Sequence, residues 1–161
     1  MSQDHLKHSE SRSYDDFADA GVHALGDLDP QDVSTLSSRE LGALGELLAA
    51  SYLEARGYDV LEHSYRCPEG EADLIAYDPV TEEIVLVEVK TRRAPKGDGT
   101  FPEEAVNYKK RQRYRRIAAC YIMDHFPVMS LRFDVVALTI HGGSDADIVH
   151  HIDVFQWEAE Q

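Results

Sequence analysis

Residues 70–92 read GEADLIAYDPVTEEIVLVEVKTR, and this stretch decides how the fold is interpreted. Two segments rich in apolar and β-branched residues, 71–77 and 84–91, are separated by 78–82, where Asp and Pro favour a turn. The second segment is almost continuously apolar through Val89, which is typical of a strand buried on both faces. The sequence therefore predicts a β-hairpin whose second strand lies inside a sheet.

Three charged side chains are expected to meet on this hairpin. Asp73 lies on the first strand beside Glu88 on the second, and Glu88 and Lys90 point to one face because side chains alternate along a strand. The two carboxylates, with the main-chain carbonyl of Val89, offer the oxygen ligands that Mg²⁺ or Mn²⁺ prefers. Such an ion promotes phosphodiester hydrolysis, and Lys90 would orient the water or stabilise the developing negative charge.

A helix over residues 37–56 precedes the hairpin. Ser37 and Glu40 have the spacing of a capping box, apolar residues then recur at helical intervals, and Gly57 ends the pattern. Glu46 lies in this helix among small and apolar neighbours, so its carboxylate needs a partner. That partner is a metal ion or its bound water, Lys90, or Arg66, and we treat Glu46 as a candidate fourth catalytic residue.

The remaining elements complete an α/β pattern. The order helix, three strands, helix, strands predicts a sandwich in which helices flank a central mixed sheet. The other expected strands are 58–66, 131–140 and, on an edge, 148–155, and the second helix is 103–125.

Three regions divide the chain. Residues 1–36 are rich in Ser, Asp and His without a sustained apolar period, and we expect an acidic, disordered arm. Residues 37–157 form the expected folded domain, and 158–161 a short tail.

The formal net charge of −14 would by itself disfavour a nucleic-acid partner. The charge is unevenly distributed, however: residues 1–38 sum to −6 and 141–161 to −5, whereas 90–116 sum to +7. Local potential decides where a polyanion binds, so the basic block predicts a nucleic-acid surface.

The basic side chains in and near this block have two interpretations, a solvated helix face or a phosphate-binding surface. In the second interpretation, Tyr108 and Tyr114 are available to stack on bases. Arg66 would either pair with Glu71 or contact phosphate. The residues predicted to bind nucleic acid are Arg66, Arg92, Arg93, Lys96, Lys109, Lys110 and Arg113.

From Gly42 to about Leu138 the chain resembles the YraN family of uncharacterised bacterial proteins, which look like restriction-endonuclease-like nucleases. The similarity extends in order over most of the domain. The family usually has Ile at the position of Ala72, a difference that leaves the acidic positions intact. The matching segments are 45–46, 70–76, 87–92, 105–106 with Lys110, and 132–136.

The resemblance implies the PD-(D/E)xK fold, a restriction-endonuclease-like three-layer sandwich shared with Holliday-junction resolvases. It implies the roles described above for Asp73, Glu88 and Lys90, with Glu46 as the acid carried by the helix. The expected function is a Mg²⁺- or Mn²⁺-dependent endonuclease acting on DNA rather than RNA, with branched or recombination and repair intermediates as candidate substrates. Resolvases of this fold act as dimers, so a homodimer is expected. The alternative is a catalytically silent module that retained the fold for binding nucleic acid or protein.

The sequence offers no membrane signal. No apolar run approaches the roughly 20 residues of a membrane-spanning helix, and the N-terminus lacks the pattern of a secretory signal. We therefore expect a cytoplasmic protein. Cys67 and Cys120 show no CxxC spacing, and we expect two reduced thiols rather than a disulfide or a zinc site.

Overall fold

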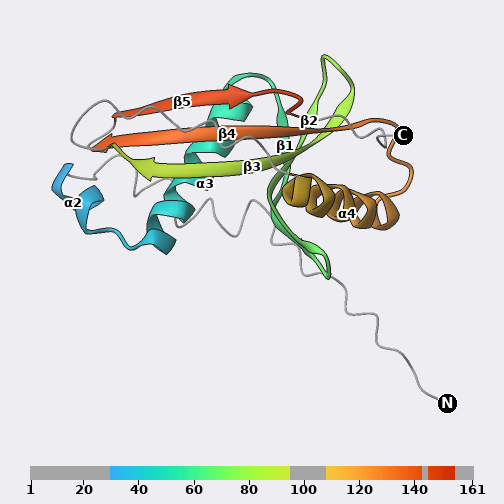
Figure 1. The fold of residues 1–161 in the computed structure, drawn as a ribbon. Helices are drawn as coiled ribbons and strands as arrows, with labels where there is room; N and C mark the ends of the chain where they lie inside the picture. Colours follow the sequence, from blue (N-terminus) through green and yellow to red (C-terminus); the bar gives the residue numbers. More distant parts are fainter. Residues whose placement is uncertain (1–29, 95–107, 143–144, 155–161) are drawn as a thin grey trace.

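A computed structural model describes residues 30–94, 108–142 and 145–154 as an α/β sandwich built on one five-stranded sheet (Figure 1). The strand order is β1-β2-β3-β4-β5, and all neighbours are antiparallel except β3 and β4, which are parallel. The sheet is therefore mixed, as predicted. The elements are α2 (Pro30–Thr35), α3 (Ser38–Ala55), β1 (Asp59–Cys67), β2 (Gly70–Asp78), β3 (Glu83–Arg93), α4 (Tyr108–Asp124), β4 (Leu131–Gly142) and β5 (Asp145–His151).

Helix α3 begins and ends where its capping residues require. The Ser37 hydroxyl accepts a hydrogen bond from the Glu40 N–H at 3.2 Å, and the Glu40 carboxylate accepts one from the Ser37 N–H at 2.7 Å. Both bonds satisfy main-chain donors that a helix start leaves without partners. Gly57 follows the last turn with φ of +89°, a conformation that favours glycine. The predicted helix over 37–56 is confirmed.

The two faces of the sheet are covered by different helices. On one face Ala49, Ala50 and Leu53 of α3 pack against a buried cluster that includes Val85 and Val87. On the other, the buried side chains of α4 (Tyr114, Ile117, Ala118, Tyr121) pack against residues that include Leu86. Consecutive residues of β3 thus contribute to opposite cores, which explains its uninterrupted apolar sequence.

A buried arginine holds the end of the β2–β3 hairpin against β4. The Arg132 guanidinium bonds both carboxylate oxygens of Asp134, at 3.0 and 3.2 Å, and also reaches Asp78 at 2.9 Å and Glu83 at 3.0 Å. Burial would raise the pKa of Asp134, but hydrogen bonds from His150 and Arg132 hold that pKa below its ordinary value. Because every charge in this network has partners, it is a structural network.

Two predicted boundaries were wrong. Residues 30–35, assigned to the arm, form α2, and Val33 is buried against Leu41 and Ile140, so the folded part begins before Ser37. The last strand is Asp145–His151 rather than 148–155. It starts directly after β4 as an antiparallel partner, and it ends near Asp153, whose positive φ turns its N–H toward Asp134. Residues 1–29, 95–107, 143–144 and 155–161 lie outside the described part of the chain, so the predicted start of the second helix at 103 is among them.

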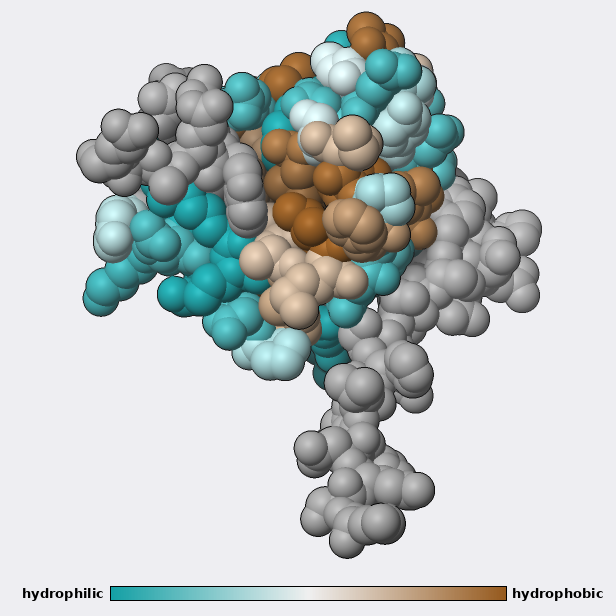
Figure 2. Space-filling view, turned by 90° about the vertical axis from the view of Figure 1, so that its right-hand side faces the viewer, coloured by the Kyte–Doolittle hydropathy of each residue, from teal (hydrophilic) through white to brown (hydrophobic). Residues whose placement is uncertain are grey.

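An apolar surface lies at the end of the molecule where α4 passes into β4. Figure 2 looks at this end and shows apolar side chains gathered on one face. Met123, Phe126 and Met129, in the last turn of α4 and the following loop, are among the most exposed large apolar residues that the structure describes. No helix among the described residues is long and apolar enough to cross a membrane.

Candidate active site

Asp73 lies at the point where β2 and β3 separate. The paired register runs from Asp78 opposite Glu83 to Leu74 opposite Val87 and stops there. Beyond this point a side chain of β2 bonds the main chain of β3: Asp73 Oδ2 accepts a hydrogen bond from the Val89 N–H at 2.7 Å. The carboxylate is thereby fixed between the two strands, beside Glu88, as the predicted hairpin required.

Glu88 and Lys90 lie together on the α4 side of β3. Lys90 Nζ is 3.0 Å from Glu88 Oε1, and the Glu88 side chain is only 17% exposed. Tyr114, on the buried face of α4, forms a second hydrogen bond with the Glu88 carboxylate. Burial and the nearby charge of Glu88 raise the pKa of Tyr114 well above its ordinary value, so the phenol keeps its proton and donates it to that bond.

The environment of Asp73 disfavours its negative charge. Burial raises the pKa of this carboxyl to about 6, and the charges of Glu88 and Glu71 add to the increase. The Val89 N–H and the positive charge of Lys90 oppose it but do not cancel it. A nearby cation would stabilise the ionised form of such a buried carboxylate.

Glu46 reaches the same region from α3. Burial, followed by the charges of Asp73 and Glu71, raises its pKa to about 7, while Arg66 lowers it in part. The neighbouring Gly45 allows this approach: a Cβ placed on Gly45 would lie 1.7 Å from Thr91 Oγ1, so α3 packs directly on β3 here. The structure thus brings Glu46, Asp73, Glu88 and Lys90 into one electrostatic group, in which Asp73 contacts Val89, and Glu88 contacts Lys90 and Tyr114.

The donor set fits a divalent cation that keeps much of its own water. Among residues 30–94, 108–142 and 145–154, no three His, Cys, Asp or Glu side chains come close enough to enclose a metal ion by themselves. The raised pKa values of Asp73 and Glu46 nevertheless arise in part from mutual repulsion of acidic groups, which a divalent ion would relieve. Mg²⁺ commonly binds proteins through one or two carboxylates plus water. The predicted Val89 carbonyl ligand stays a prediction.

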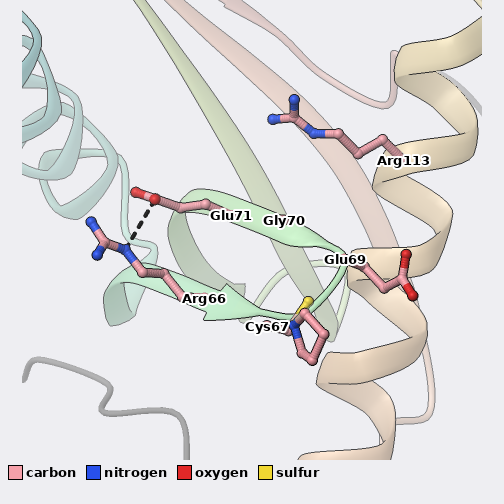
Figure 3. A pocket seen from close by; sticks show the side chains of 7 residues that line it. Arg66, Cys67, Glu69, Gly70, Glu71 and Arg113 are labelled. Atoms are coloured by element: carbon pink, nitrogen blue, oxygen red, sulfur yellow. Dashed lines mark hydrogen bonds and ion pairs between the residues drawn. The ribbon is translucent and has the colours of Figure 1, made fainter.

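Two predicted phosphate-binding arginines line one open pocket beside this group. The pocket has a volume of about 520 Å³, and Arg66, Glu71 and Arg113 are among its lining residues. Figure 3 shows Arg113 extending from α4 above the β1–β2 hairpin, while Arg66 points toward Glu71. Arg66 Nε is 3.0 Å from Glu71 Oε2, so the ion pair is the contact that this structure contains.

The other predicted basic residues divide into different groups. Arg93 donates from Nε to the Val33 carbonyl at 3.0 Å and from Nη2 to the Leu36 carbonyl. These bonds attach α2 to the sheet, so its role is structural and its assignment to phosphate binding is not supported. Lys109 is exposed and Arg92 is half-buried, as is Lys110. Lys96 lies outside the described residues.

Tyr114 was misinterpreted from the sequence, and the helical spacing contained the correction. It is 7% exposed and packs near Phe133, so it cannot stack on bases, whereas Tyr108 is 67% exposed. Tyr114 stands three and four residues before Ile117 and Ala118, the spacing of a buried helix face. The charge of Glu71 raises the pKa of both Asp73 and Glu46. The sequence did not predict this effect, and no helical or strand spacing indicates it.

Comparison with known proteins places the chain among bacterial relatives. The family model described as "Uncharacterised protein family UPF0102" matches residues 45–138, which include all four members of the electrostatic group. The chain belongs to the UPF0102 family. A UPF0102 protein of Mycolicibacterium smegmatis is 43% identical over 122 residues, covering 73% of this chain and 94% of the relative. Those of Moorella thermoacetica and Nocardia farcinica are 46% and 45% identical, covering 65% and 71% of this chain and 84% and 88% of the relatives.

The UPF0102 match agrees with the YraN resemblance drawn from the motifs. The matched region contains α3 from Gly45 and all of β1, β2, β3 and α4, so it includes every element that contributes to the candidate active site. It ends within β4, and α2 and β5 lie outside it.

Proposed function

We propose that this UPF0102 protein is a cytoplasmic, Mg²⁺- or Mn²⁺-dependent endonuclease that hydrolyses phosphodiester bonds in DNA, with branched or recombination and repair intermediates as substrates. The observation that carries the proposal is the meeting of Asp73, Glu88 and Lys90 where β2 and β3 separate, with Glu46 close enough to share their electrostatic field.

Each residue has a distinct part in the proposed reaction. Asp73 and Glu88 would hold the ion, which when bound supplies an activated water and neutralises charge on the phosphate. Lys90 would stabilise the negative charge that develops in the transition state, or orient the attacking water. Glu46, with a pKa of about 7, would accept or return a proton near neutral pH.

The basic residues beside the site would bind the DNA backbone. Arg66 and Arg113 line the pocket next to Glu71, and Lys109, Lys110 and Arg92 lie on α4 and β3. In the absence of DNA, Arg66 is paired with Glu71, an exposed pair of the kind that contributes little to stability and exchanges readily for phosphate. These contacts would be independent of base sequence.

The direct test offers the purified protein branched, single-stranded and duplex DNA with Mn²⁺ and measures cleavage. Wild-type protein is expected to cut at least one of these, and Asp73→Ala and Glu88→Ala to lose cleavage by 100-fold or more, on the order expected for removal of a principal catalytic group. Asp59→Ala is the matched control, because Asp59 is an exposed carboxylate at the start of β1. Cleavage that survives both active-site substitutions would refute the assignment of these residues.

A second candidate function is supported by the acidic excess of the chain, −14 overall. In this alternative the fold serves as a binding module for nucleic acid or protein without hydrolysis. Calorimetric titration with Mn²⁺ separates the two, since the nuclease requires metal binding that Asp73→Ala removes. DNA affinity measured across salt concentrations then distinguishes a nucleic-acid module, whose affinity falls steeply with salt, from a protein-binding one.

We also propose that the protein acts as a homodimer, since a four-way junction needs two symmetry-related cuts. Light scattering coupled to gel filtration measures the molar mass directly. A mass of one 18.1 kDa chain at all concentrations tested would refute this part of the proposal.

A further inference from the structure

The two cysteines, distant in the sequence, lie next to each other in the fold. Cys67 is the last residue of β1 and packs against the core cluster that contains Ile117 and Ala118 of α4, and Cys120 of α4 is close enough for the Cys67 thiol to act on its titration. Both are free thiols and both are half-buried. The sequence predicted two reduced cysteines, which agrees with this state, but it offered no sign that the two sulfur atoms meet.

Two further contacts hold the β1–β2 hairpin against α4 close to these cysteines. Cys67 is paired in register with Gly70, where a Cβ would come within 3.0 Å of Ile117 Cδ1. At the tip, Glu69 Oε2 is 3.0 Å from Arg116 Nε. Because Cys120 follows Ile117 by three residues, it lies on the same side of α4, and the hairpin holds Cys67 against it.

We propose that Cys67 and Cys120 are a redox-active pair that forms a reversible intramolecular disulfide. A disulfide requires the two sulfur atoms to approach to about 2.05 Å, with the Cβ atoms about 3.5–4.5 Å apart. The packing of the β1–β2 hairpin on α4 holds the two thiols in the same neighbourhood, which is the first condition for this bond.

The surroundings assign different roles to the two sulfurs. Cys67 lines the pocket of about 520 Å³, so a small oxidant reaches it first (Figure 3). Burial, together with the nearby Cys67 thiol, raises the pKa of Cys120 to about 11, so Cys120 keeps its proton until its partner has reacted. Cys67 is therefore the attacking residue and Cys120 the resolving one.

The oxidant is a low-molecular-weight disulfide. The Cys67 thiolate attacks one of its sulfurs, and a mixed disulfide forms as the first small thiolate leaves. Cys120 then loses its proton and attacks the Cys67 sulfur, and the second small thiol leaves with that proton. Two protein thiols are thus oxidised to one disulfide while the external disulfide is reduced to two thiols.

The cross-link would act on the pocket that contains Arg66 and Arg113. Arg66 precedes Cys67 on β1, and Arg113 is on α4, so the disulfide would join the two elements that carry these arginines. It would close a covalent loop from residue 67 to residue 120 and reduce the conformational freedom of the unfolded chain. We expect the oxidised protein to be more stable, with a Tm higher by about 5 °C or more.

The test incubates the folded, full-length protein with oxidised glutathione and measures intact mass, free thiols and Tm. Wild-type protein is expected to lose two free thiols and the mass of two hydrogen atoms, to retain no glutathione, and to yield a linked Cys67–Cys120 peptide. Dithiothreitol should reverse the mass and Tm changes. Cys120→Ser should instead accumulate glutathione on Cys67, because the resolving thiol is absent.

Cys67→Ser is the complementary variant and should react more slowly, since Cys120 is not among the residues that line the pocket and its pKa is raised. Circular dichroism shows whether each variant remains folded, and the wild-type mass and peptide measurements decide the proposal even if a variant does not fold. Wild-type protein that carries two glutathiones, forms only intermolecular disulfides, or does not react in the folded state would overturn the proposal.

Discussion

Substitution of Gly45 by Ala tests the close packing of α3 on β3 that brings Glu46 toward Asp73. The added Cβ would lie 1.7 Å from Thr91 Oγ1, 2.7 Å from Thr91 Cβ and 2.8 Å from Thr91 Cγ2. Rotation of the threonine side chain cannot relieve all three contacts, because the Cβ atom is fixed by the backbone of β3. The helix must therefore move away from the sheet, or β3 must bend.

The expected cost follows from two opposing effects. Overpacking of a core site costs about 1–3 kcal/mol. Replacing a helical glycine by alanine contributes up to about 1 kcal/mol in the other direction. The net expectation for Gly45→Ala is a decrease of about 1–2 kcal/mol in the free energy of unfolding, which lowers the folded-to-unfolded ratio roughly 5- to 30-fold.

Gly42→Ala is the matched control in the same helix. No atom lies within 4 Å of a Cβ placed there, so only the helix preference acts and stability should rise by about 0.5–1 kcal/mol. Urea unfolding followed by circular dichroism measures both variants. Thr91→Ala removes Oγ1 and Cγ2, and Gly45→Ala should cost less in that background.

An equal increase in the urea midpoint for both glycine variants would show that α3 does not approach β3 as described. Absence of any rescue by Thr91→Ala would show that the cost of Gly45→Ala has another origin. If the packing argument holds, Gly45→Ala should also slow DNA cleavage, because Glu46, the proposed proton acceptor, moves together with its neighbour.

Three further predictions concern other buried groups. The ordinary pKa of Glu46 is 4.5 and its folded value is about 7, so the folded state binds the extra proton; the free energy of unfolding should fall as pH rises through this window, and Glu46→Gln should flatten that part of a urea-midpoint series. Tyr114→Phe should keep the fold but weaken calorimetric Mn²⁺ binding several-fold, since Glu88 loses a hydrogen-bond donor; unchanged affinity would contradict the contact. Arg132→Met should cost about 3–5 kcal/mol by leaving Asp134 buried without its main charge partner, and a near-native Tm would argue against this network.

Much of the fold was predictable because local signals and tertiary packing agree. The Ser37–Glu40 capping box, the turn after β2 and the apolar run of β3 each depend on neighbouring residues, and all three appear in the structure. The predictions for α2 and β5 were wrong for the opposite reason. Burial of Val33 and pairing of β5 with β4 depend on residues far away in the sequence.

The candidate site shows the same division. Alternation along β3 was enough to place Glu88 and Lys90 on one face, and the hairpin was enough to place Asp73 beside them. The sequence could not show that Tyr114 from α4 would bond Glu88 or that Arg93 would bond the backbone next to α2. Such pairings follow from how helices cross the sheet, which no local pattern describes.

The sequence by itself determined the motif, its order of strands and the chemistry of its carboxylates and lysine, because residue type and strand period are local properties. The tertiary structure alone decided how strongly those groups interact. Burial and neighbouring carboxylates raise the pKa values of Asp73 and Glu46, and packing of the β1–β2 hairpin on α4 brings Cys67 toward Cys120. Electrostatic energies and thiol contacts depend on distance in space, and in this protein those distances are set by the packing of both helices on the central sheet.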